Sequence, residues 1–282
     1  MFLLVLLAYH ETEVSRANVL HFVEFGSLPP SAGEEVFVLN GRHSLPGSAF
    51  EAPNVLVVER ENACFDFGAW GVGLERAAAA FGRLERYSHF VLMNGSVRGP
   101  FLPLFEARPW WVVFVDQLGG PGNVGLVGTS LNCWASLGET HLQSMFLATH
   151  AAGFFDVVVP SGVLGCKADH DAAVFGGEIP LSRAFLDAGY GLKTQLVAFR
   201  DLLPAPGVVT PAAARAEGQE GARLYELCLR LLENNAHGGD LQYPAEYGGA
   251  DVHPLEVVFP KTGRGVAQTT LNAYAAWARP PP

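Results

Sequence analysis

Short apolar segments alternate with helical patterns through the first two thirds of the chain. Runs typical of buried strands lie at residues 2–8, 35–39, 55–58, 90–93 and 124–128. Apolar residues recur with helical spacing over 13–25, and residues 68–81 form a second helical pattern with a face of small side chains. Apolar strands separated by helices predict an α/β fold, with a mostly parallel sheet covered by helices on both faces.

The rest of the chain is less regular. Residues 143–148 fit either a strand or a helix. The other elements expected there are a helix at 179–188, a strand at 192–199, an amphipathic helix at 223–234 and a strand-like run at 255–259. Residues 203–221 are rich in Pro, Ala and Gly, which is typical of a linker or mobile loop, and the proline-rich C-terminus is expected to fray. We expect one α/β domain over residues 1–202, with residues 203–282 packed on it.

Composition narrows the functional class. The chain has 282 residues, of which 49% are hydrophobic and 16% charged, so it can bury a substantial core. Its net charge is −10, from 28 acidic and 18 basic residues. That balance argues against a nucleic-acid-binding protein, which should present a basic surface. It does not argue against binding a nucleotide, because backbone N–H groups and one or two local cations can hold phosphates.

The cysteines and the N-terminal residues bear on location. The four cysteines are far apart and form no CxxC pair, so we expect them to be reduced and to serve packing. The apolar start at residues 1–8 lacks the basic residues and cleavage pattern of a signal peptide, and it is too short to cross a bilayer. We expect it to be a buried strand. No other segment is long and apolar enough to span a membrane, so a soluble, cytoplasmic protein is expected.

Several common catalytic motifs are absent from the sequence. There is no GxxxxGK[ST], no GxGxxG opening the first helix, no GxSxG and no HExxH. Their absence excludes P-loop kinases, Rossmann dehydrogenases, serine hydrolases of the nucleophile-elbow type and zincins.

Polar clusters follow several of the expected strands. They are Tyr9-His10-Glu11-Thr12, Glu61-Asn62 with Asp66, and Asn94-Gly95-Ser96 with Arg98; a fourth, Gly177-Glu178, opens a helix. Each has an ordinary structural alternative, because Thr12 and Asp66 fit helix caps and Glu178 suits a helix N-terminus. Ligands of α/β sheets bind outside the carboxyl ends of the strands. The joint placement of the clusters therefore indicates one ligand cleft.

The order of these motifs resembles a known family. YHET, ENACFDFGAW, FVLMNGSVRGPFLP, NVGLVGTSLNC, HLQSMFLAT and GGEIPLSRAFLDAGY occur in the same order in GT-A-fold glycosyltransferase-like proteins. That family is related to bacterial rhamnan-synthesis transferases and, more distantly, to the large inverting nucleotide-sugar transferase family. The resemblance covers about residues 3–200, and HPLEVVFPKTGR at residues 253–264 matches a recurrent tail. It implies a GT-A-like three-layer sandwich.

The resemblance also implies roles for individual residues. The positions that match the donor-binding segments are Tyr9, His10, Glu11, Thr12, Asn62, Asp66, Gly68, Asn94, Gly95, Ser96 and Arg98. Glu178 matches the catalytic base of inverting members. His141, Gln143 and Arg183 fall in segments that face the acceptor. Phe65 and Phe67, which flank Asp66, fit a stacking surface for a base or a sugar.

Two departures from the family pattern leave the cofactor open. Asn94 and Ser96 stand where relatives carry an acidic pair for Mg²⁺ or Mn²⁺, and neutral ligands bind such ions weakly. The protein could work without metal, using Arg98 or His10 to neutralise a diphosphate; another acid could hold the ion; or the protein could bind without catalysing. The second departure is Ala63-Cys64, where relatives often have a basic residue and glycine.

The sequence thus predicts a hexosyltransferase-like enzyme of polysaccharide biosynthesis. Its partners would be a nucleoside-diphosphate sugar and a glycan or other hydroxyl acceptor, with inversion at the transferred carbon. The main alternative is a catalytically inactive GT-A-like protein that binds nucleotides or glycans. A nucleotidyltransferase fits less well, because YHETEVSR after the first strand is not the glycine-rich loop of that class.

Overall fold

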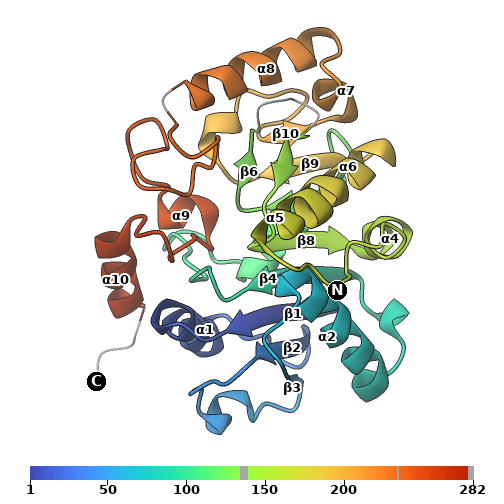
Figure 1. The fold of residues 1–282 in the computed structure, drawn as a ribbon, viewed down its shortest axis with the longest axis vertical. Coiled ribbons are helices and arrows are strands. Elements are labelled where there is room, and N and C mark those ends of the chain that lie inside the picture. Colours follow the sequence, from blue (N-terminus) through green and yellow to red (C-terminus); the bar gives the residue numbers. More distant parts are fainter. Residues whose placement is uncertain (134–138, 234, 279–282) are drawn as a thin grey trace.

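A computed structural model describes residues 1–133, 139–233 and 235–278. Within them, eight strands form one sheet in the order β10-β9-β5-β8-β4-β1-β2-β3 (Figure 1). The strands are β1 (Leu3–His10), β2 (Gly33–Asn40), β3 (Val55–Arg60), β4 (His89–Asn94), β5 (Val124–Gly128), β8 (Phe146–His150), β9 (Gly191–Thr194) and β10 (Val208–Val209). A two-stranded ribbon joins β6 (Leu131–Asn132) and β7 (His141–Leu142).

The sheet is mixed and mostly parallel. Strands β1, β2, β3 and β4 are parallel to their neighbours in this half of the sheet, and β5 is parallel to β9. β8 is antiparallel to both β4 and β5, and β10 is antiparallel to β9. The α/β prediction is therefore confirmed, and the ambiguous segment 143–148 contains the start of a strand.

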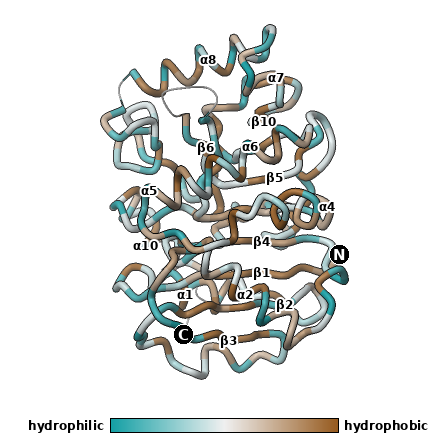
Figure 2. The backbone as a smooth tube through the Cα atoms, turned by 45° about the vertical axis from the view of Figure 1, so that its right-hand side comes forward, coloured by the Kyte–Doolittle hydropathy of each residue, from teal (hydrophilic) through white to brown (hydrophobic). Residues whose placement is uncertain are grey.

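Helices cover both faces of the sheet, as expected. They are α1 (Glu13–Phe25), α2 (Phe65–Phe81), α3 (Trp110–Val115), α4 (Ala151–Gly153), α5 (His170–Ala173), α6 (Ile179–Asp187), α7 (Pro211–Ala214), α8 (Gly218–Leu232), α9 (Pro254–Val257) and α10 (Gln268–Trp277). Successive side chains of a strand point to opposite faces, and β1 shows the result. Leu4 and Leu6 belong to the hydrophobic core that includes α2 and α6, whereas Leu3, Val5 and Leu7 belong to the core with α1 and α3. The central strands are accordingly hydrophobic along their length (Figure 2).

The C-terminal region differs from its sequence prediction. The expected linker at residues 203–221 contains β10, α7 and the start of α8, and β10 extends the main sheet. The prediction of a strand-like run at 255–259 is wrong, because residues Pro254–Val257 form a helix. Proline suits the first turn of that helix, and the His253 side chain accepts a hydrogen bond from the Leu255 N–H. Helix α10 was not expected. The expected helix end at Asn234 and the proline-rich residues 279–282 lie outside the described residues.

The chain returns to the sheet near its C-terminal end. The Arg98 N–H donates to the Pro260 carbonyl (3.1 Å), and the Thr262 N–H donates to the Ser96 carbonyl (2.9 Å). From α1, the Asn18 amide donates to the Gly95 carbonyl (2.9 Å) and to Thr262 Oγ1 (2.7 Å). These bonds place residues 260–262 directly over the end of β4, and the red C-terminal segments lie near the blue helix α1 in Figure 1.

The expectation of four reduced cysteines is wrong. Cys64 is bonded to Cys166 and Cys133 to Cys228, at sequence separations of 102 and 95. Such separations leave no local spacing signal, so only the tertiary structure pairs these residues. Among the described residues, no helix is long and apolar enough to cross a membrane.

Strand β2 carries a buried carboxyl group near its amino end. Glu35 is the third residue of β2 and is 1% exposed. Its Oε1 accepts a hydrogen bond from the Leu28 N–H (3.0 Å), while Oε2 has no hydrogen-bond partner among the described residues. Burial raises the pKa of Glu35 to about 7. Between pH 4.5 and about 7, Glu35 is therefore mostly protonated in the folded protein and mostly ionised in the unfolded chain.

This difference predicts a pH-dependent stability. The pKa of Glu35 is higher in the folded state than in the unfolded chain. The stability that comes from protonated Glu35 is therefore fully present below pH 4.5 and is lost as the pH rises to about 7. The loss is at most about 3 kcal/mol. Glu35→Gln cannot ionise and should remove this part of the pH dependence. Urea unfolding of both proteins from pH 5 to pH 8 measures it, and identical pH profiles would contradict the assignment.

Candidate active site

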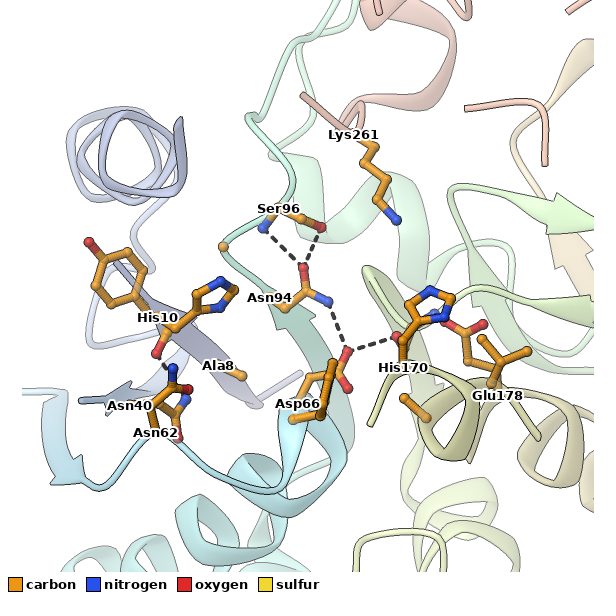
Figure 3. Close-up of a pocket in the computed structure, with 16 residues that line it drawn as sticks. Ala8, His10, Asn40, Asn62, Asp66, Asn94, Ser96, His170, Glu178 and Lys261 are labelled. Carbon is orange, nitrogen blue, oxygen red and sulfur yellow. Dashed lines mark hydrogen bonds between the residues drawn. The ribbon is translucent and has the colours of Figure 1, made fainter. Parts of the chain in front are cut away.

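A cavity of about 240 Å³ opens where β1, β2 and β4 end (Figure 3). Parallel strands bring their carboxyl ends to the same edge of a sheet, which is why three separate polar clusters meet there. The residues that line the cavity are Ala8, Tyr9, His10, Asn40, Asn62, Phe65, Asp66, Asn94, Gly95, Ser96, Ser144, His170, Ala173, Val174, Glu178 and Lys261. Eight of the predicted site residues are thereby brought together: Tyr9, His10, Asn62, Asp66, Asn94, Gly95, Ser96 and Glu178.

The end of β1 supplies one wall of the cavity. The Tyr9 ring is buried, and its hydroxyl donates to Glu11 Oε2 (3.2 Å). Burial, with the Glu11 charge beside it, raises the pKa of Tyr9 to about 12, so the phenol is neutral. The Asn40 amide donates to the Tyr9 carbonyl (2.8 Å) and so links the ends of β1 and β2. The His10 side chain is exposed at the cavity and presents an imidazole to any ligand there.

Two residues of the same cluster have structural roles instead. The Thr12 side chain accepts a hydrogen bond from the Ser15 N–H (3.0 Å) and forms a capping box at the start of α1. The Glu11 carboxylate accepts hydrogen bonds from the Ser44 N–H and hydroxyl. Neither residue lines the cavity. Thr12 thus follows the helix-cap alternative, which its position before 13–25 already offered.

A partly buried hydrogen-bond network forms the cavity floor. Asp66 Oδ2 accepts hydrogen bonds from the Asn94 amide (2.9 Å) and the Ser144 hydroxyl (2.7 Å), and Oδ1 accepts from the Phe67 N–H (3.0 Å). Burial raises the pKa of the Asp66 carboxyl, and the nearby Glu178 charge adds to the rise, although the hydrogen bonds oppose it. The network joins α2, β4 and the segment before β8 at one point.

Glu178 is the second carboxylate of the cavity. It is 8% exposed and lies inside a continuous helical segment that runs from α5 through residues 174–178 into α6. Its Oε1 accepts from the Ser144 N–H (2.6 Å), and its Oε2 lies 3.4 Å from His141 Nε2. Burial opposes ionisation, but His141 and Ser144 outweigh it, so the pKa of Glu178 lies below its usual value. Glu178 is therefore a buried carboxylate whose surroundings favour its ionised form.

The residues present do not fit a divalent cation. Asn94 Oδ1 already accepts hydrogen bonds from the Ser96 N–H (3.0 Å) and hydroxyl (2.5 Å), and the Asn94 amide nitrogen donates to Asp66. These neutral atoms satisfy one another instead of offering the charged oxygens that Mg²⁺ and Mn²⁺ prefer. In the described part of the chain, no three His, Cys, Asp or Glu side chains are grouped in a way that could hold a metal ion.

A second cavity of about 180 Å³ adjoins the first. It contains His141 and Gln143, two predicted acceptor residues, and shares His170, Val174, Glu178 and Lys261 with the first cavity. The residues of this cavity that the sequence prediction did not include are Asn132, His170, Asp171, Val174, Phe175, His237, Asp240, Tyr243, Lys261 and Arg264. Glu178 therefore lies at the junction of two polar cavities.

Buried polar groups face the second cavity. The Gln143 amide donates to Asp240 Oδ2 (3.0 Å), and Arg264 also pairs with Asp240. Gln143 Oε1 and Asn132 Oδ1 are buried and have no hydrogen-bond partner among the described residues. A buried acceptor without a donor is costly, so both atoms are suited to hydroxyl groups of a ligand.

Besides Glu11 and Thr12, three predicted residues lie outside both cavities. Arg98 is buried and donates to Asn18 Oδ1 (2.9 Å) and Asn272 Oδ1 (3.4 Å), so it holds the C-terminal segment in place. Arg183 is exposed and forms an ion pair with Asp187 (3.6 Å) one helical turn away. A Cβ atom on Gly68 would lie 2.5 Å from the Cβ of Cys64, so this glycine permits close packing against the disulfide.

Sequence reasoning missed Lys261, Ser144 and Asn40. Lys261 belongs to HPLEVVFPKTGR, which was noticed as a recurrent tail, but nothing in that motif says where the tail packs. Ser144 lies in HLQSMFLAT between the two predicted acceptor positions and β8. Asn40 ends β2 just as Asn94 ends β4, and that shared position is a signal that could have identified it.

The disulfide between Cys64 and Cys166 supports the cavity wall. Cys64 precedes α2 in a left-handed conformation (φ 68°), two residues before Asp66. We predict that Cys64→Ser/Cys166→Ser and the control Cys133→Ser/Cys228→Ser each lose about 2–5 kcal/mol of unfolding free energy, because the two loops are of similar length. Only the first variant should speed amide hydrogen exchange at residues 65–68. Urea unfolding and hydrogen exchange test this, and equal exchange at 65–68 in both variants would contradict it.

Comparisons with known proteins return glycosyltransferases of solved structure. The chain matches no family model and no curated protein. A mannosyltransferase of Pyrobaculum calidifontis, solved with GDP-Man and Mn²⁺, is 16% identical with a TM-score of 0.35 over 52% of this chain and 44% of its own. S. aureus TarS is 10% identical with a TM-score of 0.42 over 84% of this chain and 40% of its own. The bifunctional glycosyltransferase WbbM is 8% identical with a TM-score of 0.38 over 86% and 48%.

The chain spans less than half the length of each of these three proteins. Two of them, the mannosyltransferase and WbbM, are named as glycosyltransferases. Their TM-scores are too low to carry an argument about activity, so the activity must be inferred from the residues of the site.

Proposed function

We propose that the protein is a glycosyltransferase that moves a sugar from a nucleoside-diphosphate sugar to a hydroxyl group of a glycan or other acceptor, with inversion. The observation that carries this proposal is the position of Glu178, a buried ionised carboxylate at the junction of two polar cavities. Sugar transfer needs a base located between a bound donor and a bound acceptor. Glu178 meets that requirement.

The first cavity has the features of a donor site. Asn40 and Asn62 offer amide groups for the base and ribose. Phe65 lines the cavity and is 46% exposed, so its ring is free to stack on a base or sugar. Phe67, the second ring expected to stack, is fully buried and packs against Trp70 instead. Asp66 faces the same cavity and suits a contact with the ribose or the transferred sugar.

The two carboxylates favour a single displacement. Glu178 accepts the proton of the acceptor hydroxyl, the hydroxyl oxygen attacks the anomeric carbon, and the bond to the nucleoside diphosphate breaks with its electron pair on the phosphate oxygen. A double displacement would need Asp66 as a nucleophile. Asp66 is poorly suited to that role, because its oxygens already accept three hydrogen bonds and burial favours its protonated form.

The second cavity suits a hydroxyl-rich acceptor. Gln143 Oε1 and Asn132 Oδ1 provide buried hydrogen-bond acceptors, and Asp240 and Arg264 provide a charged pair. Sugars are recognised by this mixture of acceptors and donors, which supports a glycan acceptor and a role in polysaccharide biosynthesis.

The alternative function is binding without catalysis. It is favoured by one observation, the neutral Asn94 and Ser96 in place of an acidic pair. Under this alternative Glu178 would serve only to cap Ser144 and balance His141. Turnover assays distinguish the two functions, because a binding protein retains nucleotide affinity and transfers nothing.

The location of the protein remains a prediction. The sequence-based expectation of a cytoplasmic protein is drawn from the lack of a signal-peptide pattern and of a membrane-spanning segment. Two disulfides are more typical of oxidising compartments than of the cytoplasm, so they weigh against that expectation.

The test of function is a transfer assay with a panel of nucleoside-diphosphate sugars. Glu178→Gln keeps the size of the side chain but cannot accept a proton, so we expect turnover to fall by about 10²-fold or more while donor binding stays within a few-fold. The matched control Glu75→Gln changes an exposed carboxylate of α2 that lines neither cavity and should leave turnover unchanged.

Product stereochemistry completes that test. NMR of the new glycosidic bond should show the anomeric configuration opposite to that of the donor. Full turnover by Glu178→Gln would remove Glu178 as the base, and retention of configuration would remove the single displacement. Donor binding with no turnover in the wild type would favour the binding protein.

A further inference from the structure

We propose that the Lys261 ammonium group stabilises the leaving diphosphate, in the place that a divalent metal ion holds in metal-dependent transferases. This inference rests on the proposed function and adds to it a further catalytic residue, contributed by the C-terminal segment.

The need for such a group follows from the donor cavity. A departing nucleoside diphosphate gains negative charge, and that charge requires a cation close to the phosphates. The neutral pair of Asn94 and Ser96 is satisfied internally and does not fit a divalent ion, as described above. A cationic side chain must therefore supply the charge if the reaction is to proceed.

Lys261 is placed for this task by backbone pairing. Residues 260–262 lie against residues 96–98, and the Lys261 N–H also donates to Gln242 Oε1 (3.4 Å). The side chain extends from this segment into the cavity, toward the space between Asn94 and Glu178 (Figure 3). Lys261 lines both cavities, so its charge lies at the same junction as Glu178.

The ammonium group of Lys261 is uncommitted. It forms no hydrogen bond or ion pair with any described residue, and no other lysine or arginine of the described chain lines the donor cavity. The neighbouring cations have partners: Arg264 pairs with Asp240, and Lys167 donates to the carbonyls of Val163 (2.8 Å) and Gly165 (3.1 Å). A phosphate oxygen would supply the missing partner of Lys261.

Burial and the charge of Arg264 lower the pKa of Lys261, and the nearby carboxylates of Asp240, Glu178 and Asp66 offset only part of that fall. A bound diphosphate would add negative charge at this position and so favour the ammonium form of Lys261. In the reaction the bond between the anomeric carbon and the β-phosphate oxygen breaks, and the electron pair remains on that oxygen. Lys261 donates a hydrogen bond to the diphosphate as this charge develops, and it keeps its own proton.

Calorimetric titration in EDTA tests the proposal directly. The probes are UDP, GDP and dTDP, each compared with its own nucleoside. We expect the wild type to bind one diphosphate without metal, and Lys261→Met to bind that diphosphate about 10- to 100-fold more weakly, as for loss of a charge-assisted hydrogen bond. Affinity for the matching nucleoside should stay within about twofold, because Lys261 contacts only the phosphates.

Two further variants separate catalysis from structure. Lys261→Arg keeps the charge and should recover part of the diphosphate affinity and turnover. Lys193→Met removes a half-buried lysine that donates to the Pro206 carbonyl and lines neither cavity, so it should leave both unchanged. Thermal unfolding of each variant shows whether it is folded.

The outcomes are distinct. Equal losses of nucleoside and diphosphate affinity in Lys261→Met would overturn the proposal in favour of a structural role. Loss of wild-type diphosphate binding in EDTA, with recovery in Mn²⁺, would overturn it in favour of a metal. Binding of no nucleotide under either condition would reject the proposed function itself, and the Lys261 assignment with it.

Discussion

The candidate site depends on one serine between two carboxylates. The Ser144 hydroxyl donates to Asp66, and the Ser144 N–H donates to Glu178. The start of α2, the segment before β8 and the helical segment that joins α5 to α6 are thereby held at fixed separations. The two acids respond differently to the site: burial raises the pKa of Asp66, whereas His141 and Ser144 lower the pKa of Glu178.

The C-terminal segment completes this site with positive charge. The chain as a whole carries a net charge of −10, yet Lys261 and Arg264 both reach the cavities from a region far from the β1 and β4 ends in sequence. Their placement depends on Asn18 and Arg98, which tie α1, the turn after β4 and residues 260–262 together. Arg98, expected to contact a diphosphate, thus acts by holding the segment that carries another cation.

Much of the fold was predictable because local patterns decide it. The predicted positions are correct to within a few residues for strands β1 to β5 and for helices α1, α2 and α6. Short apolar runs predict strands that are buried on both faces, and helical periodicity predicts helices, so both can be recognised from short segments. Residues 203–221 were not predictable in this way, because β10 is only two residues long and exists through pairing with β9. The prediction of reduced cysteines is wrong for the same reason, because disulfide partners about one hundred residues apart leave no local pattern in the sequence.

By itself, the sequence determined that polar clusters follow apolar strands, and parallel pairing made it possible to infer that Asn62, Asp66 and Asn94 would meet. It also determined the absence of an acidic pair at Asn94 and Ser96. Only the tertiary structure decided which polar residues enter the cavities. Four predicted side chains form hydrogen bonds or ion pairs outside the cavities: those of Glu11, Thr12, Arg98 and Arg183. Packing places Ser144 and Lys261 in the cavity wall instead. The physical reason is that a polar side chain takes the nearest partner in space, and that partner is set by packing between segments distant in the chain.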